Sequence, residues 1–174
     1  MNHKYVISVD GKGVDEMLKG VQEYRKWLVR KTDELAKRLA DKGYEFSYQV
    51  LSNHVYSGQT LASLTVERVG PARYVVKAES EAILFLEFGA GVIGYGHPEP
   101  QGYGPGTYPG QTHALDPNGW WFETDDPNLA IRTSKKTGKM YGHSYGTPAY
   151  MPMYSSVKAL EMEFKAIAQE VFSN

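Results

Sequence analysis

The first pattern along the chain is a spacing of apolar residues that is typical of a helix. These residues recur at intervals of three and four, broken only at Lys31, and are Val14, Met17, Val21, Tyr24, Leu28, Leu35 and Leu39. Many of the other positions carry charged residues, and the pairs Asp33/Lys37 and Glu34/Arg38 lie four residues apart. Gly43 follows as a C-terminal stop. We therefore predict a long amphipathic helix with a solvated charged face.

The apolar spacing changes after this helix. Alternation with a period of two over residues 44–50 places Tyr44, Phe46, Tyr48 and Val50 on one side, which predicts a strand. Two β-rich runs, 61–69 and 73–78, flank Gly70-Pro71-Ala72 and predict a hairpin. A further short strand is expected at Lys4 to Val9, and residues 81–88 fit either a short helix or a buried strand.

A long loop is predicted between Gly89 and Gly119. This stretch holds nine glycines and five prolines, and its charged residues are Glu99 and Asp116. Such a density prevents helix and discourages strand pairing. Long loops inside a compact domain are usually functional or disordered. Three tyrosines, Tyr95, Tyr103 and Tyr108, lead us to expect that the loop becomes ordered against a partner.

The last third of the chain predicts more strands and a second helix. Trp120-Trp121-Phe122 begins a strand, the run from Leu129 to Thr133 is its candidate partner, and residues 135–142 form a basic turn. The closing helix follows Pro152 and repeats Met153, Val157, Leu160, Phe164, Ile167 and Val171 at steps of three and four. We expect one α+β domain over residues 1–174, with an antiparallel sheet packed against both helices and a loop at 89–119.

Composition narrows the function. Nineteen basic residues against twenty acidic ones leave a formal charge of -1, so no whole-chain field favours nucleic acid or an anionic membrane. The chain has no cysteine, which excludes disulfides and thiolate metal sites. Its first residues reach a charge too early for a secretory segment, and the longest apolar run, residues 82–86, is too short to span a bilayer.

Two segments match catalytic motifs without the context that the chemistry needs. Gly89-Ala90-Gly91-Val92-Ile93-Gly94 matches a dinucleotide fingerprint, but the glycines and prolines after it exclude the required helix. Gly142-His143-Ser144-Tyr145-Gly146 matches a nucleophile elbow, but neither Asp nor His follows Ser144. We expect neither a nucleotide site nor a hydrolase triad.

Metal and acid–base candidates are similarly weak. His97, Glu99 and His113 are normal zinc ligands by type, but no ligand spacing fixes them, and His54 and His143 have no better claim. Glu87 stands among apolar residues beside a glycine turn. A lone carboxylate in this position more often caps a helix or pairs with a base, so a structural role is expected.

The segment Phe85-Leu86-Glu87-Phe88-Gly89-Ala90-Gly91 resembles the signature of a tail-component or neck protein family of long-tailed, lambda-like bacteriophages. That signature reads glutamate, phenylalanine, glycine, small residue, glycine, and the family's usual threonine is Ala90 here. The family begins with a long helix and ends with a proline-and-aromatic segment before a final helix. Thr147-Pro148-Ala149-Tyr150-Met151-Pro152 stands in that place. The resemblance spans most of the chain.

The resemblance implies a structural virion protein of the head-to-tail junction, made in the bacterial cytoplasm, that acts without enzymatic activity or cofactor. It implies a cyclic homo-oligomer that contacts head-closure, terminator or tail proteins. It implies no membrane and no sequence-specific nucleic acid, and at most a passive lining of a DNA channel. A tail terminator is the alternative role within the same class.

Aromatic residues are enriched in protein interfaces. The interface candidates are therefore Tyr95, Tyr103, Tyr108, Trp120 and Trp121, and one tryptophan of the pair should point inward if they lie on a strand. Two alternatives come from other classes. One is a metal-dependent hydrolase that uses the loop histidines and Glu87, and the other is a host-directed module whose loop binds a carbohydrate or peptide.

Overall fold

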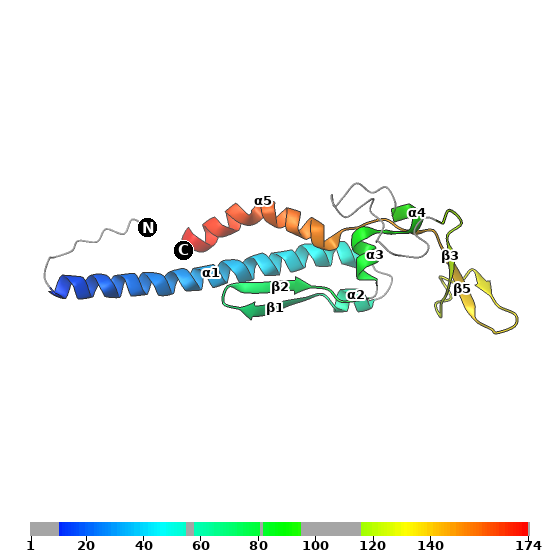
Figure 1. The fold of residues 1–174 in the computed structure, drawn as a ribbon, viewed down its shortest axis with the longest axis horizontal. Helices are drawn as coiled ribbons and strands as arrows, with labels where there is room; N and C mark the ends of the chain where they lie inside the picture. Colours follow the sequence, from blue (N-terminus) through cyan, green and yellow to red (C-terminus); the bar gives the residue numbers. More distant parts are fainter. Residues whose placement is uncertain (1–10, 55–57, 81, 95–115, 174) are drawn as a thin grey trace. The chain divides into compact units, whose positions relative to one another are not determined.

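The computed structural model describes residues 11–54, 58–80, 82–94 and 116–173 (Figure 1). The fold is α+β, as predicted, with a long N-terminal helix, a C-terminal helix and antiparallel strands. In chain order its elements are α1 (Gly11–His54), α2 (Gly58–Ala62), β1 (Thr65–Gly70), β2 (Arg73–Lys77), α3 (Ile83–Phe88), α4 (Gly91–Gly94), β3 (Trp120–Glu123), β4 (Arg132–Thr133), β5 (Met140–Ser144), β6 (Gly146–Thr147) and α5 (Pro152–Ser173). The strand expected at residues 4–9 lies outside the described residues.

Contacts divide the chain into two compact units. The first combines the chain up to Phe46 with residues 64–77 and the chain from Ser156 onward. The second combines residues 47–63 with residues 78–155. Both α1 and α5 contribute residues to each unit, and a single domain over residues 1–174 stays a prediction.

The first unit contains the predicted hairpin, although its first strand begins at Thr65 and not at Leu61, which belongs to α2. β1 and β2 pair antiparallel, with Thr65 opposite Lys77 and Arg68 opposite Tyr74, and the register shifts between Arg68 and Gly70. Ala72, in the turn between the strands, adopts a φ of 49°. That left-handed conformation is unfavourable for a residue with a side chain, so the turn needs support from its surroundings.

Asp33 of α1 provides this support. Its carboxylate accepts hydrogen bonds from the backbone N–H of Ala72 at 2.9 Å, from Arg68 at 2.7 Å and from the Tyr74 hydroxyl at 3.3 Å. These bonds, the one from Ala72 foremost, hold the pKa of Asp33 below its ordinary value. The predicted Asp33/Lys37 pair is therefore replaced. Lys37 instead contacts Asp41 at 2.6 Å, whereas the predicted Glu34/Arg38 pair forms at 3.1 Å.

The predicted end of α1 at Gly43, and the strand predicted after it, are wrong. The helix continues to His54 and includes all of residues 44–50. Ala40, Gly43, Ser47 and Leu51 are buried, and their spacing of three, four and four is helical. A Cβ built at Gly43 lies 3.2 Å from the Leu160 side chain. Glycine at this position therefore marks a close approach to α5 rather than a helix stop.

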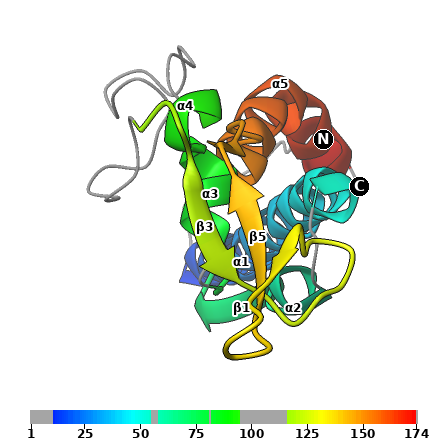
Figure 2. The same ribbon diagram turned by 90° about the vertical axis from the view of Figure 1, so that its right-hand side faces the viewer.

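The second unit contains a three-stranded antiparallel sheet with the order β3-β5-β4. β3 and β5 lie side by side, with Trp121 opposite His143 and Glu123 opposite Tyr141 (Figure 2). The strand beginning at Trp120 is thus confirmed. The partner proposed for it is wrong, because Arg132–Thr133 pairs with β5 instead. The basic turn is also shorter than predicted, since β5 begins at Met140.

For residues 81–88 the sequence fits either a short helix or a buried strand. The structure forms the helix α3 at Ile83–Phe88. One correction concerns the predicted loop, because α4 forms a single helical turn at Gly91–Gly94. Residues 95–115 of that loop lie outside the described part of the chain. Leu51, Leu86, Ala90 and Ala149 are buried in this unit, together with the polar Ser47 and Thr60.

Candidate interaction surface

The signature segment and the proline-and-aromatic segment lie against each other in the second unit. Ala90 and Thr147 form one antiparallel bridge, and Gly91 and Gly146 form the next. The backbone N–H groups of Tyr150 and Met151 donate to the carbonyl of Leu86, at 2.8 and 3.2 Å. Two stretches that are more than fifty residues apart in the sequence therefore form one local structure.

Glycine is required at the bridges. Gly91 and Gly146 have φ values of 60° and 115°, which side-chain-bearing residues rarely adopt. A Cβ at Gly146 would collide with the carbonyl of Ala90, and one at Gly91 would lie 2.5 Å from the carbonyl oxygen of Tyr145. The two backbones can approach this closely only because both positions lack side chains.

Glu87 fixes the start of α5. Its side chain is buried, with 9% of the residue exposed, and its two oxygens accept the backbone N–H groups of Met153 at 2.9 Å and Tyr154 at 2.8 Å. The first N–H groups of a helix have no partner within the helix, and the helix dipole favours a negative charge there. The structural role expected for Glu87 is confirmed, and of its two alternatives it is the cap that forms.

His54, at the end of α1, completes this region. Its ring stacks on Tyr150 with centroids 3.8 Å apart and an interplanar angle of 12°.

Ser144, the nucleophile of the rejected hydrolase motif, ends β5 and is followed by the strand β6. Its Oγ accepts the N–H of Gly146 at 3.0 Å, so it serves the turn between these strands.

The two adjacent tryptophans point to opposite sides of β3, as predicted. Trp120 is half-buried, and its ring lies against Gly91, where it would meet an added Cβ at 2.7 Å. Trp121 is 52% exposed. Its ring contacts His143 edge-on at 4.7 Å, and His143 contacts Tyr145 at 4.8 Å. Of these two interface candidates, Trp121 is the more exposed.

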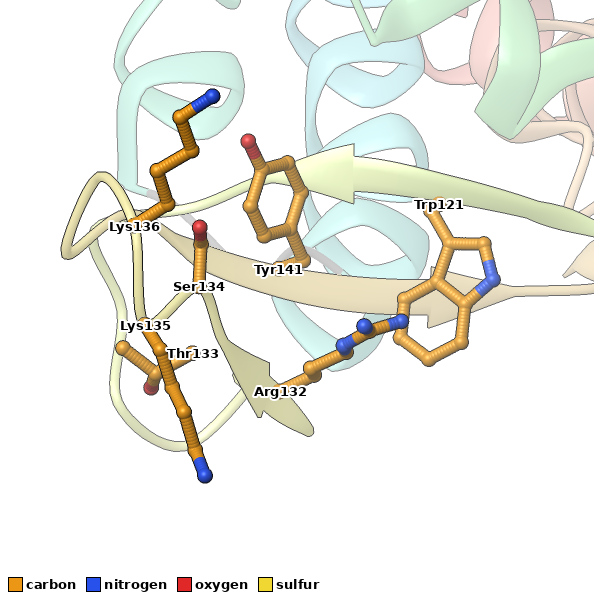
Figure 3. A pocket seen from close by; sticks show the side chains of 7 residues that line it. All are labelled: Trp121, Arg132, Thr133, Ser134, Lys135, Lys136 and Tyr141. Atoms are coloured by element: carbon orange, nitrogen blue, oxygen red, sulfur yellow. The ribbon is translucent and has the colours of Figure 1, made fainter.

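A groove lies beside Trp121. It has a volume of about 550 Å³ and is lined by aromatic, hydroxyl and cationic side chains, among them Trp121, Tyr141, Ser134, Arg132, Lys135 and Lys136 (Figure 3). Arg132 extends toward the Trp121 indole, and Lys136 points to the same side as the Tyr141 hydroxyl. Sequence reasoning placed a basic turn here. It missed the groove, because the groove depends on how β4 and β5 pair.

One neighbouring cation is already engaged. Lys139 contacts Glu123 at 2.8 Å, and this hydrogen bond raises the pKa of Lys139. In the described ranges of the chain, Arg132, Lys135 and Lys136 form no ion pair. They are the charges that the groove can offer to a ligand.

The remaining sequence candidates lie outside this surface. Tyr95, Tyr103 and Tyr108 belong to residues that the structure does not describe, as do His97, Glu99 and His113. Among the residues that it does describe, no three His, Cys, Asp or Glu side chains gather to hold a metal ion.

Comparisons with models of known protein families, with curated proteins and with solved structures give no match. No helix within the described ranges has the length and apolar character needed to cross a membrane.

Proposed function

We propose that this chain is a structural subunit of the neck or tail-completion region of a long-tailed bacteriophage, where it assembles into a ring with copies of itself and contacts head-closure, terminator or tail proteins. The observation that carries this proposal is the contact between Glu87 and the start of α5. The resemblance rests on two segments, and Glu87 joins the first to the residues that directly follow the second. The signature has a glutamate followed by glycines. The glutamate would be needed for this cap, and the glycines would be needed because the two backbones approach closely.

The surface of α1 supports assembly. Five large apolar residues are each at least 40% exposed along one side of its N-terminal half, namely Val14, Leu18, Val21, Tyr24 and Leu28. A stripe of this spacing is the part of a helix that normally packs against another element. Exposed apolar surface of this kind marks sites of protein–protein contact. A neighbouring subunit in a ring would remove these side chains from water.

Deleting the gene from its phage or prophage and imaging the particles by negative-stain microscopy tests the proposal. Filled heads and separate tails should accumulate, because the junction between them is incomplete. Tails of uncontrolled length would instead indicate the terminator role. Normal infectious particles would refute a structural role in the virion.

Complementation makes the test specific to the chain's surface. A plasmid copy carrying Val21→Asp should fail to restore infectivity, because a charge replaces an apolar contact in the exposed stripe. Lys19→Asp, on the charged side of the same helix, is the matched control and should restore it. Mass spectrometry of purified wild-type particles should detect the chain, and its absence from them would contradict a virion location.

A further inference from the structure

The pairing of three strands collects aromatic and cationic side chains on one face of the second unit's sheet. Residues directly opposite each other in antiparallel strands project to the same face. Tyr141 lies opposite both Glu123 and Arg132, and Trp121 lies opposite His143. The register therefore brings Arg132, Tyr141 and Trp121 to one side, where they line the groove.

Cations gather beside this groove although the whole chain is nearly neutral. Residues 127–139 contain four cations, Arg132, Lys135, Lys136 and Lys139, and no acidic residue, and the acidic segment 123–126 directly precedes them. Lys139 is paired with Glu123, whose position opposite Tyr141 places it on the same face. The other three cations have no carboxylate partner within the described ranges. A ligand with negative charge would therefore complement the groove.

The aromatic rings restrict the ligand further. Trp121, His143 and Tyr145 form a series of rings in edge-on contact, and Trp121 and Tyr145 are 52% and 50% exposed. An apolar subunit contact would suit Trp121 alone, but cations line the groove beside it. Exposed rings next to unpaired cations are the combination that binds single strands, because bases stack on the rings while phosphates meet the cations.

We propose that this groove binds a single-stranded nucleic acid without sequence preference. Phosphates of the strand lie on Arg132, Lys135 and Lys136, and an unpaired base stacks on Trp121. The proposal uses side chains of the second unit only. It stands apart from the ring assembly, so its failure would leave the structural role untouched.

Fluorescence anisotropy of a labelled oligothymidine with the full chain tests this assignment. Three phosphate contacts predict that the logarithm of the association constant falls with the logarithm of salt concentration at a slope of about −2. Lys135→Ala/Lys136→Ala should reduce the slope to about −0.7. The control Lys19→Ala/Lys26→Ala removes the same charge from exposed positions on α1 and should leave the slope unchanged.

Trp121 separates stacking from charge. Trp121→Ala should weaken binding roughly ten-fold or more at every salt concentration without changing the slope. Trp121→Phe keeps a ring and should recover part of the affinity. Ultraviolet cross-linking of the wild-type complex should attach the oligonucleotide within residues 120–145, a result that does not depend on the folding of any variant.

Four outcomes would overturn the proposal. The first is an absence of oligonucleotide binding, and the second is a set of cross-links that all lie outside residues 120–145. The third is a duplex that binds as tightly as the single strand while Trp121→Ala has no effect on either. The fourth is displacement of the strand by a polyglutamate peptide at an equal concentration of charge. That result would assign the groove to an acidic protein segment.

Discussion

The backbone N–H of Ala72 donates a 2.9 Å hydrogen bond to the carboxylate of Asp33. Ala72 has a positive φ, and Asp33 also accepts hydrogen bonds from Arg68 and Tyr74. One carboxylate of α1 thus supports a strained turn and both strands of the hairpin. The side chain remains 30% exposed, so water competes for these bonds.

This contact predicts an acid-sensitive hairpin. The pKa of Asp33 is lower in the folded state than in the unfolded state, so in acid the folded state binds fewer protons than the unfolded state and the stability falls with the pH. The stabilisation is fully present above the ordinary aspartate pKa of about 3.9 and is lost as the pH falls through the lower folded value. The hydrogen-exchange protection factors of the amides that pair β1 with β2 should fall over this range.

Asp33→Asn provides the comparison. The variant should show lower protection factors at neutral pH and a flatter dependence of protection on pH, because its side chain does not titrate. Asp15→Asn, an exposed position on the same helix, should behave as the wild type. An unchanged pH profile in Asp33→Asn would show that another group causes the acid sensitivity.

Glu87→Ala should destabilise the second unit by roughly 1–3 kcal/mol, because it leaves two partly buried N–H groups of α5 without an acceptor. Glu87→Gln keeps one acceptor oxygen and should lose less. Chemical denaturation followed by circular dichroism measures both. Glu16→Ala, exposed on α1, is the control. Equal stability of Glu87→Ala and the wild type would rule out the cap as a stabilising contact.

Alanine substitutions at two glycines distinguish the cost of backbone strain from the cost of a steric collision. Gly146 and Gly138 both have positive φ, at 115° and 73°, but a Cβ at Gly138 meets nothing within 4 Å. Gly138→Ala should cost about 1–2 kcal/mol from strain alone. Gly146→Ala should cost clearly more, because the added methyl meets the carbonyl of Ala90. Similar losses of thermal stability in both variants would contradict the collision.

The tryptophan pair predicts opposite consequences for stability and binding. Trp120→Ala should lower the free energy of unfolding by roughly 2–3 kcal/mol, because the ring packs against Gly91. Trp121→Ala should change it by less than about 1 kcal/mol, since half of this residue is exposed. Denaturation of both variants in parallel measures the difference. A larger loss for Trp121→Ala would mean that its ring belongs to the core.

Some features of the fold and of the site follow from the local sequence, and others do not. The hairpin, the closing helix and the alternation of Trp120 and Trp121 follow from local periodicity and turn residues, and all three are confirmed. The role of Glu87 could also be predicted, because a carboxylate between apolar residues needs donors. Its actual donors, at Met153 and Tyr154, were out of reach because they lie 66 and 67 residues away.

The extension of α1 shows why local pattern failed. Tyr44, Phe46 and Tyr48 alternate like a strand, but the buried side of the helix carries the small residues Gly43 and Ser47. Hydrophobicity does not mark such positions, since their burial reflects close packing rather than apolar character. The groove was hidden for a similar reason, because it depends on the register between Arg132 and Tyr141.

The hydrogen bonds of Glu87 also set an order of events during synthesis. The ribosome makes Glu87 well before Met153 and Tyr154. The carboxylate therefore stays hydrated until the start of α5 has emerged from the ribosome. A nascent chain that ends before Pro152 cannot bury α3 without leaving the Glu87 carboxylate buried and without its hydrogen-bond donors. The second unit therefore completes its packing late in translation, and truncation before α5 should leave the signature segment exposed to proteases.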